Sequence, residues 1–134
     1  MITTNAFDYI NIMDKAADAS WMRESALANN ISNIDTPGYK RQDVDFQSVL
    51  QRELGGALDA GHKSLQREVR RLNKDLGRLE VSPYTDAANY SYRLDKNNVD
   101  VDTEHVELAS EQMRYELITT AINGSFSWAK VVLK

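Results

Sequence analysis

Apolar residues recur along the N-terminal part of the chain at spacings of three, four and seven residues, which match one face of an α-helix. Neither Pro nor Gly interrupts this stretch, so the pattern predicts one long helix over residues 4–34, with Thr4 or Asn5 as its cap. The stripe is narrow and rich in alanine, and we expect the helix to need partners on more than one side. Its members are Ile10, Met13, Ala17, Trp21, Ala28 and Ile31.

The residues that follow predict a turn and then a short helix. A residue before proline is disfavoured in the helical region, and a Pro-Gly pair favours a tight turn, so the first helix should stop by Thr36. Residues 39–46 form a charged stretch that we expect to be extended. Residues 46–54 should form a short helix that ends at the glycine pair 55–56.

Leucine and valine side chains in the middle of the chain alternate at spacings of four and three residues, which predicts an amphipathic helix over residues 62–79. Whether this helix packs on its own chain or on another subunit stays open. Pro83 breaks the pattern, and residues 90–94 alternate as a short strand would. The apolar positions of the helix are Leu65, Val69, Leu72, Leu76 and Leu79.

The last predicted helix covers residues 103–132, with Asp102 or Thr103 as its cap, and it is apolar on two faces. A helix of this kind has to be buried from two directions, and one N-terminal helix cannot cover both faces. The pattern therefore indicates contacts with other subunits. One face contains Val106, Met113, Leu117, Ala121, Trp128 and Val131, and the other contains Leu108, Tyr115, Ile118, Ile122, Phe126, Ala129 and Leu133.

These elements predict a mainly α fold, in which long N- and C-terminal helices pair as a coiled-coil-like hairpin. A shorter polar middle segment, with the amphipathic helix and an extended or short β piece, should lie between them. A length of 134 residues suits one domain. We divide it into the N-terminal helix 4–34, the turn and extended segment 35–54, a variable middle 55–98 and the C-terminal helix 103–132.

Charge is distributed unevenly along the chain. The net charge of −4 argues against nucleic-acid binding. Residues 62–80 carry six basic and three acidic side chains, whereas residues 86–116 carry eight acidic and three basic ones. Opposite fields of this kind could guide subunits into register, or each could be a solvated helix face.

Candidate chemistry is sparse, and we predict no catalytic, cofactor or metal site, no small-molecule substrate and no enzyme activity. The chain has no cysteine, and His62 and His105 lack metal-ligand spacing, so both are expected on helix surfaces. Glu104, Glu107 and Glu111 share one helix face. Nothing in the sequence separates their pKa values, and we expect a solvated stripe or a docking face for a basic partner.

Three asparagines, Asn29, Asn30 and Asn33, cluster at the end of the first helix, although asparagine disfavours helix interiors. Their amides could bond carbonyl groups at the helix end, or they could bond between neighbouring subunits and fix register. The sequence leaves both possibilities open.

Residues 25–46, SALANNISNIDTPGYKRQDVDF, resemble the N-terminal signature of bacterial flagellar axial proteins. The run from Asp35 to Lys40, followed by Asp43-Val44-Asp45-Phe46, is similar to the proximal rod proteins of the flagellar basal body. Residues 97–130 are similar to the closing helix of the same family. The signature turn consists of Asn29, Asn30, Asn33, Asp35, Thr36, Pro37, Gly38 and Tyr39.

The resemblance implies a structural subunit of the basal-body rod, which assembles with copies of itself and other rod proteins into a helical tube with the terminal helices as its inner core. It also implies contacts with the inner-membrane ring and passage through the flagellar type III export apparatus. The N-terminus lacks the pattern of a cleaved signal peptide, which agrees with that route. Phe46 and Leu50 resemble the export-gate motif of rod and hook subunits, or they form an amphipathic helix turn.

The expected assembly places residues 29–40 at a subunit junction and the two long helices against neighbouring subunits. The alternative is a soluble helical adaptor or export-chaperone-like binding module that never polymerises. The residues expected to carry subunit packing are Ile10, Met13, Trp21, Leu27, Ile31, Val106, Met113, Leu117, Ile118, Ile122, Phe126 and Trp128.

Overall fold

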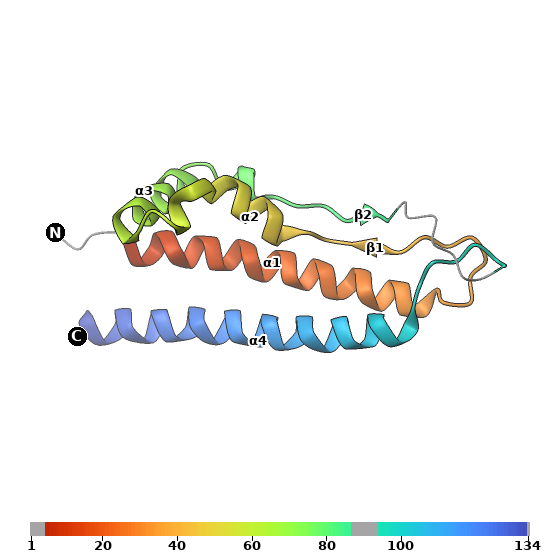
Figure 1. The fold of residues 1–134 in the computed structure, drawn as a ribbon. Helices are drawn as coiled ribbons and strands as arrows, with labels where there is room; N and C mark the ends of the chain where they lie inside the picture. Colours follow the sequence, from red (N-terminus) through yellow and green to blue (C-terminus); the bar gives the residue numbers. More distant parts are fainter. Residues whose placement is uncertain (1–4, 87–93, 134) are drawn as a thin grey trace.

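Two long antiparallel helices span the molecule, as the computed structural model of residues 5–86 and 94–133 shows (Figure 1). Helix α1 (Asn5–Ser32) and helix α4 (Val101–Val132) lie side by side, and both termini are at the same end. The elements between them cover α1 on the side away from α4. This arrangement confirms the predicted mainly α fold with a helical hairpin.

The start of α4 differs from the prediction. The N-cap is Asp100, whose carboxylate accepts hydrogen bonds from the backbone N–H groups of Asp102 and Thr103. The predicted cap at Asp102 or Thr103 was therefore wrong, because both residues already belong to the first turn. Several polar residues in a row offer equivalent caps in sequence, and tertiary contacts decide which of them is used.

A two-stranded antiparallel sheet links the turn region to the rest of the middle segment. Strand β1 (Gln42–Asp43) pairs with β2 (Tyr84–Thr85), with Gln42 opposite Thr85 and Asp43 opposite Tyr84. The extended stretch predicted after the first helix is thus present as β1 and its flanks. The strand predicted over residues 90–94 lies outside the described residues except for Leu94.

The middle segment continues with α2 (Phe46–Leu54), η1 (Gly55–Leu58), α3 (His62–Asn73) and η2 (Leu76–Leu79), in which η denotes a 3₁₀-helix. Asp45 caps α2 and Gly55, with a φ of 55°, ends it, as the glycine pair predicts. The continuous helix predicted over residues 62–79 was wrong. The chain leaves the helix after Asn73, since Asn, Asp and Gly at positions 73, 75 and 77 all disfavour helix interiors.

The apolar core of the middle segment lies between these short helices and the N-terminal half of α1. The break after α3 turns Leu79 back toward Leu72, and both side chains are fully buried. The predicted amphipathic helix therefore packs on its own chain. The core consists of Leu54, Val69, Leu72 and Leu79, with Tyr9, Ile12, Phe46, Leu50, Leu65 and Leu76 packed against it.

Candidate functional site

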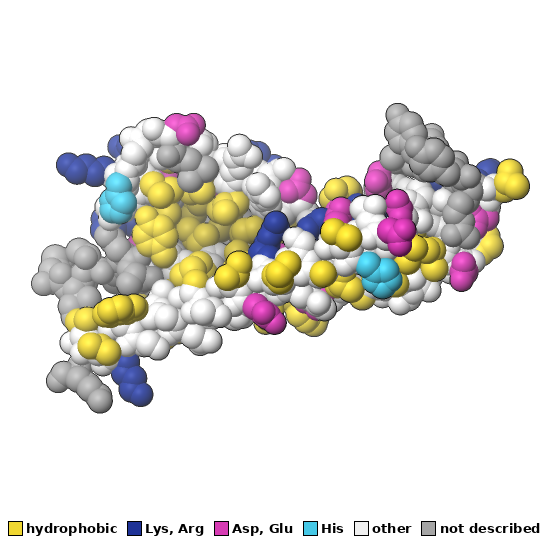
Figure 2. Space-filling view, turned by 60° about the horizontal axis from the view of Figure 1, so that its bottom comes forward, with side chains coloured by type: hydrophobic (Ala, Val, Ile, Leu, Met, Phe, Trp, Pro, Cys, Tyr) yellow, Lys and Arg dark blue, Asp and Glu magenta, His cyan; other side chains and the backbone are white. Residues whose placement is uncertain are grey.

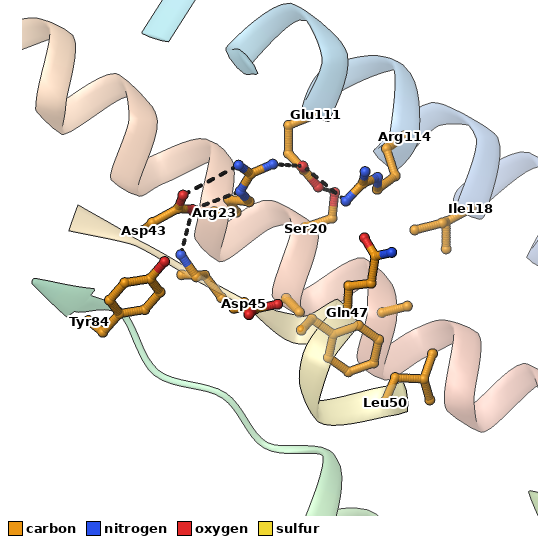
Figure 3. A pocket seen from close by; sticks show the side chains of 14 residues that line it. Ser20, Arg23, Asp43, Asp45, Gln47, Leu50, Tyr84, Glu111, Arg114 and Ile118 are labelled. Atoms are coloured by element: carbon orange, nitrogen blue, oxygen red, sulfur yellow. Dashed lines mark hydrogen bonds and ion pairs between the residues drawn. The ribbon is translucent and has the colours of Figure 1, made fainter. Parts of the chain in front are cut away.

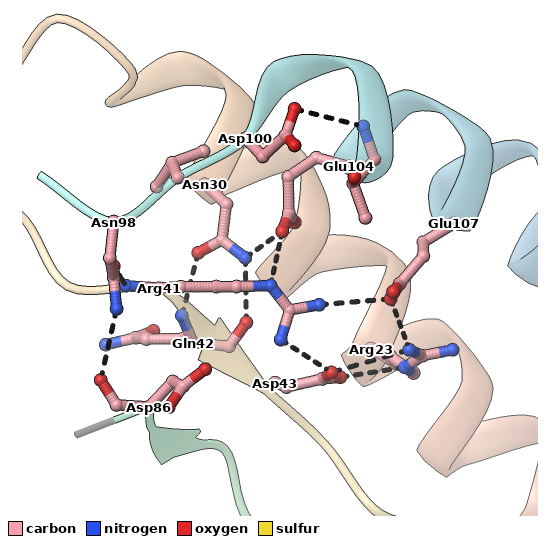
Figure 4. A network of polar contacts seen from close by, with 12 residues as sticks. Arg23, Asn30, Arg41, Gln42, Asp43, Asp86, Asn98, Asp100, Glu104 and Glu107 are labelled. Carbon is pink, nitrogen blue, oxygen red and sulfur yellow. Dashed lines mark hydrogen bonds and ion pairs between the residues drawn. The ribbon is translucent and has the colours of Figure 1, made fainter. Parts of the chain in front are cut away.

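A network of ion pairs joins α1, β1 and the first half of α4 (Figure 4). Arg23 on α1 lies at its centre, and its guanidinium donates to Asp43 at 2.7 Å, Glu107 at 2.6 Å and Glu111 at 2.8 Å. The planar fork of arginine suits this arrangement because its N–H groups point in several directions at once. One side chain thus ties three segments of the chain together.

A second guanidinium extends the network toward the start of α4. Arg41 donates to Asp43 at 2.9 Å, to Glu107 at 3.0 Å and also to Glu104. Asp43 and Glu107 are therefore shared between the two arginines. Two cations and four carboxylates form one continuous cluster.

The burial of this cluster overturns one sequence prediction. Glu104 and Glu111 are 1% and 2% exposed, so the carboxylates of α4 form neither a solvated stripe nor a docking face for another molecule. A buried carboxylate has to be paired, and the arginines supply the pairing within the same chain. The sequence signal was present: glutamates three and four residues apart on α4 oppose an arginine on the antiparallel helix.

The pKa values of Asp43, Arg23 and Arg41 are shifted toward their charged forms. Burial works to raise the pKa of Asp43, but hydrogen bonds from Arg23 and the Val44 N–H outweigh it, so the pKa lies below its usual range. Hydrogen bonding to Asp43 raises the pKa of Arg23. Burial works to lower the pKa of Arg41, but the hydrogen bond to Glu104 and the charges of Glu104 and Asp43 outweigh it, so the pKa is raised. Such a network holds segments of the chain together.

Asn30 is fully buried beside this cluster, and both ends of its amide are bonded within the chain. The Nδ2 atom donates to the Gln42 carbonyl at 2.7 Å and to Glu104 at 2.9 Å, while Oδ1 accepts from the Gln42 N–H and the Tyr39 hydroxyl. Asn33 donates to the Asn29 carbonyl at 2.8 Å. Asn33 thus bonds a carbonyl group at the helix end, which is one of the two possibilities that the sequence leaves open. Asn30 instead bonds Gln42 and Glu104, which neither possibility included.

The signature turn lies at one end of the hairpin, where the segment that precedes α4 also lies (Figure 1), and Asn97 of that segment holds its backbone. The Asn97 side chain is buried, and its Nδ2 donates to the carbonyls of Asn33, Ile34 and Thr36. Sequence reasoning missed this residue, because its partners are more than 60 positions away. Asp35, Thr36, Pro37 and Gly38 are exposed, and Gly38 has a φ of 72°, which favours glycine.

A groove opens between α1, α4 and the start of α2 (Figure 3). Its apolar lining includes Phe46, Leu50 and Ile118, and its polar rim includes Arg23 and Glu111. The rim side chains already bond one another, so the groove presents few free polar groups. Among residues 5–86 and 94–133, no group of His, Cys, Asp and Glu is arranged to hold a metal ion.

The residues predicted to carry subunit packing fall into two sets. Ile10 and Leu27 are buried, and Met13, Ile31, Ile118 and Ile122 are half-buried. The others are exposed on the surface. These are Trp21, Val106, Met113, Leu117, Phe126 and Trp128.

One exposed set lies along one side of α4, and we call it the outer α4 face. It consists of Val106, Met113, Leu117, Trp128 and Val131, each more than 60% exposed, while Leu108, Tyr115, Ile118 and Ile122 on the other face are half-buried. Figure 2 shows apolar side chains along α4, and more of them in a hollow near the α2 and α3 end. The chain thus partly covers one apolar face of α4 as far as Ile122 and leaves the other open, while Phe126, on the partly covered face, is 48% exposed.

The predicted export motif lies at the start of α2. Phe46 and Leu50 are half-buried and pack against the middle core, one helical turn apart. His62 and His105 are exposed on helices, as predicted. Within the part of the chain that the structure describes, no helix is both long and apolar enough to cross a lipid bilayer.

Comparisons with known proteins find similarity to flagellar basal body rod proteins. The family model "Flagella basal body rod protein" matches residues 23–40. The chain is 36% identical to the flagellar basal body rod protein FlgB of Bacillus subtilis, with 92% of each chain covered. It is 32% identical to FlgB of Borrelia hermsii, over 93% of this chain and 95% of the relative. Its identity to FlgB of Escherichia coli is 29%, over 93% and 92% respectively.

Proposed function

Because the chain belongs to the FlgB family of flagellar basal body rod proteins and is a structural subunit of the rod, we propose that it assembles through the outer α4 face. This face would pack on copies of the chain and on other rod proteins to build a helical tube. The signature resemblance of residues 35–46 supports a position in the proximal part of the rod.

The observation that carries this proposal is the exposure of the outer α4 face. Leu117 and Trp128 are 71% and 75% exposed in the single chain, and they lie on one side of a 32-residue helix. A contiguous apolar surface on a water-soluble element is typical of an interaction site. Contacts between different surfaces of identical subunits propagate as a helix when their rotation does not close a ring.

A charge on this face tests the proposal. Leu117→Asp should leave the monomer folded, because the side chain is exposed, yet reduce incorporation into isolated basal bodies by at least about tenfold, the effect of ~1.4 kcal/mol lost at an interface. Asn123→Asp adds the same charge at another exposed position of α4 and should have little effect. Normal incorporation of the Leu117→Asp chain, measured by quantitative immunoblotting, would contradict the proposal.

We further propose that the signature turn lies at a subunit junction next to the inner-membrane ring or another rod protein. Its exposed residues, with the backbone held rigidly by Asn97, support this role. A preformed turn can bind a neighbour without the entropy cost of ordering a loop.

Export through the flagellar type III apparatus belongs to the same proposal. Phe46 and Leu50 contact the middle core in the folded chain, so the export gate would bind them only before folding. This order of events is consistent with subunits that leave the cell unfolded and fold where they assemble.

The same features support a non-enzymatic role. The carboxylates that offered acid and base chemistry in sequence are bonded to Arg23 and Arg41. The alternative of a soluble adaptor or export-chaperone-like module gains no support from the relatives, which are rod proteins by name.

A further inference from the structure

Helix α3 presents a row of cations to solvent. Lys63 and Arg67 of α3 and Lys74, the residue that caps its end, occupy positions i, i+4 and i+11, so they lie on one side, and all three are exposed. Val69 and Leu72 are buried on the other side. None of the three cations forms an ion pair with another described residue. Figure 2 shows basic side chains projecting from the end of the molecule that carries α3.

A shallow groove of opposite character lies on the seam between α1 and α4. Asp14, Asp18 and Trp21 line it from α1, and Tyr115, Thr119 and Ile122 line it from α4. Both aspartates are exposed, and Trp21 is 63% exposed. Carboxylates beside aromatic rings form a favourable environment for a guanidinium or ammonium group, which gains from both charge and ring.

The cations of α1 lie elsewhere and leave this groove acidic. Lys15 approaches Glu80 at 3.9 Å, and Arg23 is held in the buried network. Asp14 and Asp18 have no ion-pair partner among residues 5–86 and 94–133. The described part of the chain therefore exposes an acidic and aromatic groove and a cationic row, neither of which it pairs internally.

We propose that the cationic row on α3 of one subunit docks into the Asp14–Asp18–Trp21–Tyr115 groove of the next copy, an inference that rests on the proposed self-assembly. The spacing supports it, because Lys63 and Arg67 are separated by one helical turn, as are Asp14 and Asp18. The two surfaces belong to different elements, so each copy offers one and accepts the other. Such a contact is heterologous and extends from copy to copy.

This contact would set the direction and register of neighbouring subunits, whereas the outer α4 face would contribute the apolar area that they bury. Exposed ion pairs contribute little affinity but strongly disfavour wrong alignments, because like charges would then meet. The basic stretch 62–80 would thus take part in this contact, whereas the acidic stretch 86–116 would not, because Asp14 and Asp18 lie outside it.

Cysteine pairing tests the contact in isolated basal bodies, because the chain has no cysteine of its own. Gln66→Cys lies beside the cationic row and Thr119→Cys lies in the groove, so both substitutions keep every charge. A chain with both cysteines, treated with a short bismaleimide, should give a ladder of covalent dimers, trimers and higher forms. The control pair Gln51→Cys and Thr119→Cys, with Gln51 exposed on α2, should give none.

Charge reversal then separates a true contact from chance proximity. Asp14→Lys with Asp18→Lys should reduce the ladder at least about tenfold, and Lys63→Glu with Arg67→Glu in the same chain should restore it. Asp59→Lys, an exposed residue outside the groove, is the matched control and should leave the ladder unchanged.

Each remaining outcome has a distinct meaning. A chain that enters basal bodies without forming the ladder overturns this contact and leaves the rod function standing. A chain absent from basal bodies overturns both. If Gln66→Cys is linked only to a different protein, the cationic row binds that protein and this proposal fails. It also fails if Lys63→Glu with Arg67→Glu abolishes binding to phosphatidylglycerol vesicles but leaves the ladder intact, because the cationic row then binds a membrane.

Discussion

Arg23 shows how one residue can define the position of a whole helix. The buried residues of α4 in the described structure are Glu104 and Glu111, and Arg23 bonds one of them directly. Apolar contacts between alanine-rich helices tolerate sliding, but a buried carboxylate that slides away from its arginine loses its pairing. The register of α1 against α4 therefore depends on ionic contacts more than on the apolar stripe.

Replacement of Arg23 should destabilise the fold strongly. Arg23→Leu leaves Glu111 and Asp43 buried without their main partner, and we expect the free energy of unfolding to fall by about 3–5 kcal/mol. Arg23→Lys keeps the charge without the fork and should give a smaller loss. Urea unfolding followed by circular dichroism measures both.

The control for this prediction is Arg114→Leu. Arg114 also approaches Glu111, at 3.5 Å, but its side chain is half exposed, so the loss should be about 1 kcal/mol or less. Equal losses for the two leucine variants would show that the network is not the source of the stability.

At the scale of elements, the middle segment acts as a clamp on the N-terminal half of α1. Helix α3 and the 3₁₀-helix η2 bury leucines against α2, while Asn73 on α3 bonds Asn11 and Asp8 on α1. The leucine spacing predicted the buried face correctly. The apolar period hides the break after Asn73, because the leucine at position 79 continues it even though the backbone has turned. The signal for the break was the Asn, Asp and Gly at positions 73, 75 and 77.

Leu72→Ala should release this clamp. The side chain is fully buried, and its removal leaves a cavity that should cost about 2–5 kcal/mol. We expect faster proteolysis within residues 62–79 while α1 and α4 remain paired. Leu94→Ala, at a fully exposed leucine, is the control and should behave as the unchanged chain. Equal cleavage of the two variants would show that α3 is not held by this core.

Across the whole molecule, the buried contacts that hold α4 are concentrated at one end of the hairpin. The network and the Asn97 bonds hold the end where α4 begins, whereas no described residue of α4 after Glu111 is fully buried. The C-terminal half of α4 thus lacks a complete core in the single chain. Under the proposed assembly, its apolar residues would be covered by neighbouring subunits.

Hydrogen exchange should reveal this gradient. In the purified monomer, amides of residues 117–132 should exchange faster than those of residues 104–111, because local opening there exposes little buried surface. In isolated basal bodies both segments should be protected to a similar degree. A monomer in which residues 117–132 are already as protected as residues 104–111 would contradict the idea that assembly completes the fold of α4.

Sequence by itself determined the helical hairpin, the end of the first helix, the capped helix over residues 46–54 and the two apolar faces of the last helix. Each of these depends on local periodicity, proline and glycine geometry or a resemblance carried by consecutive residues. Only the tertiary structure decided the partners of Asn30 and Asn97, the burial of Glu104 and Glu111, and which face of α4 stays open. Those features depend on atoms brought together from positions far apart in the chain. A polar side chain is stable inside the protein only if a partner lies close enough to compensate for its lost hydration, and the sequence does not contain these distances.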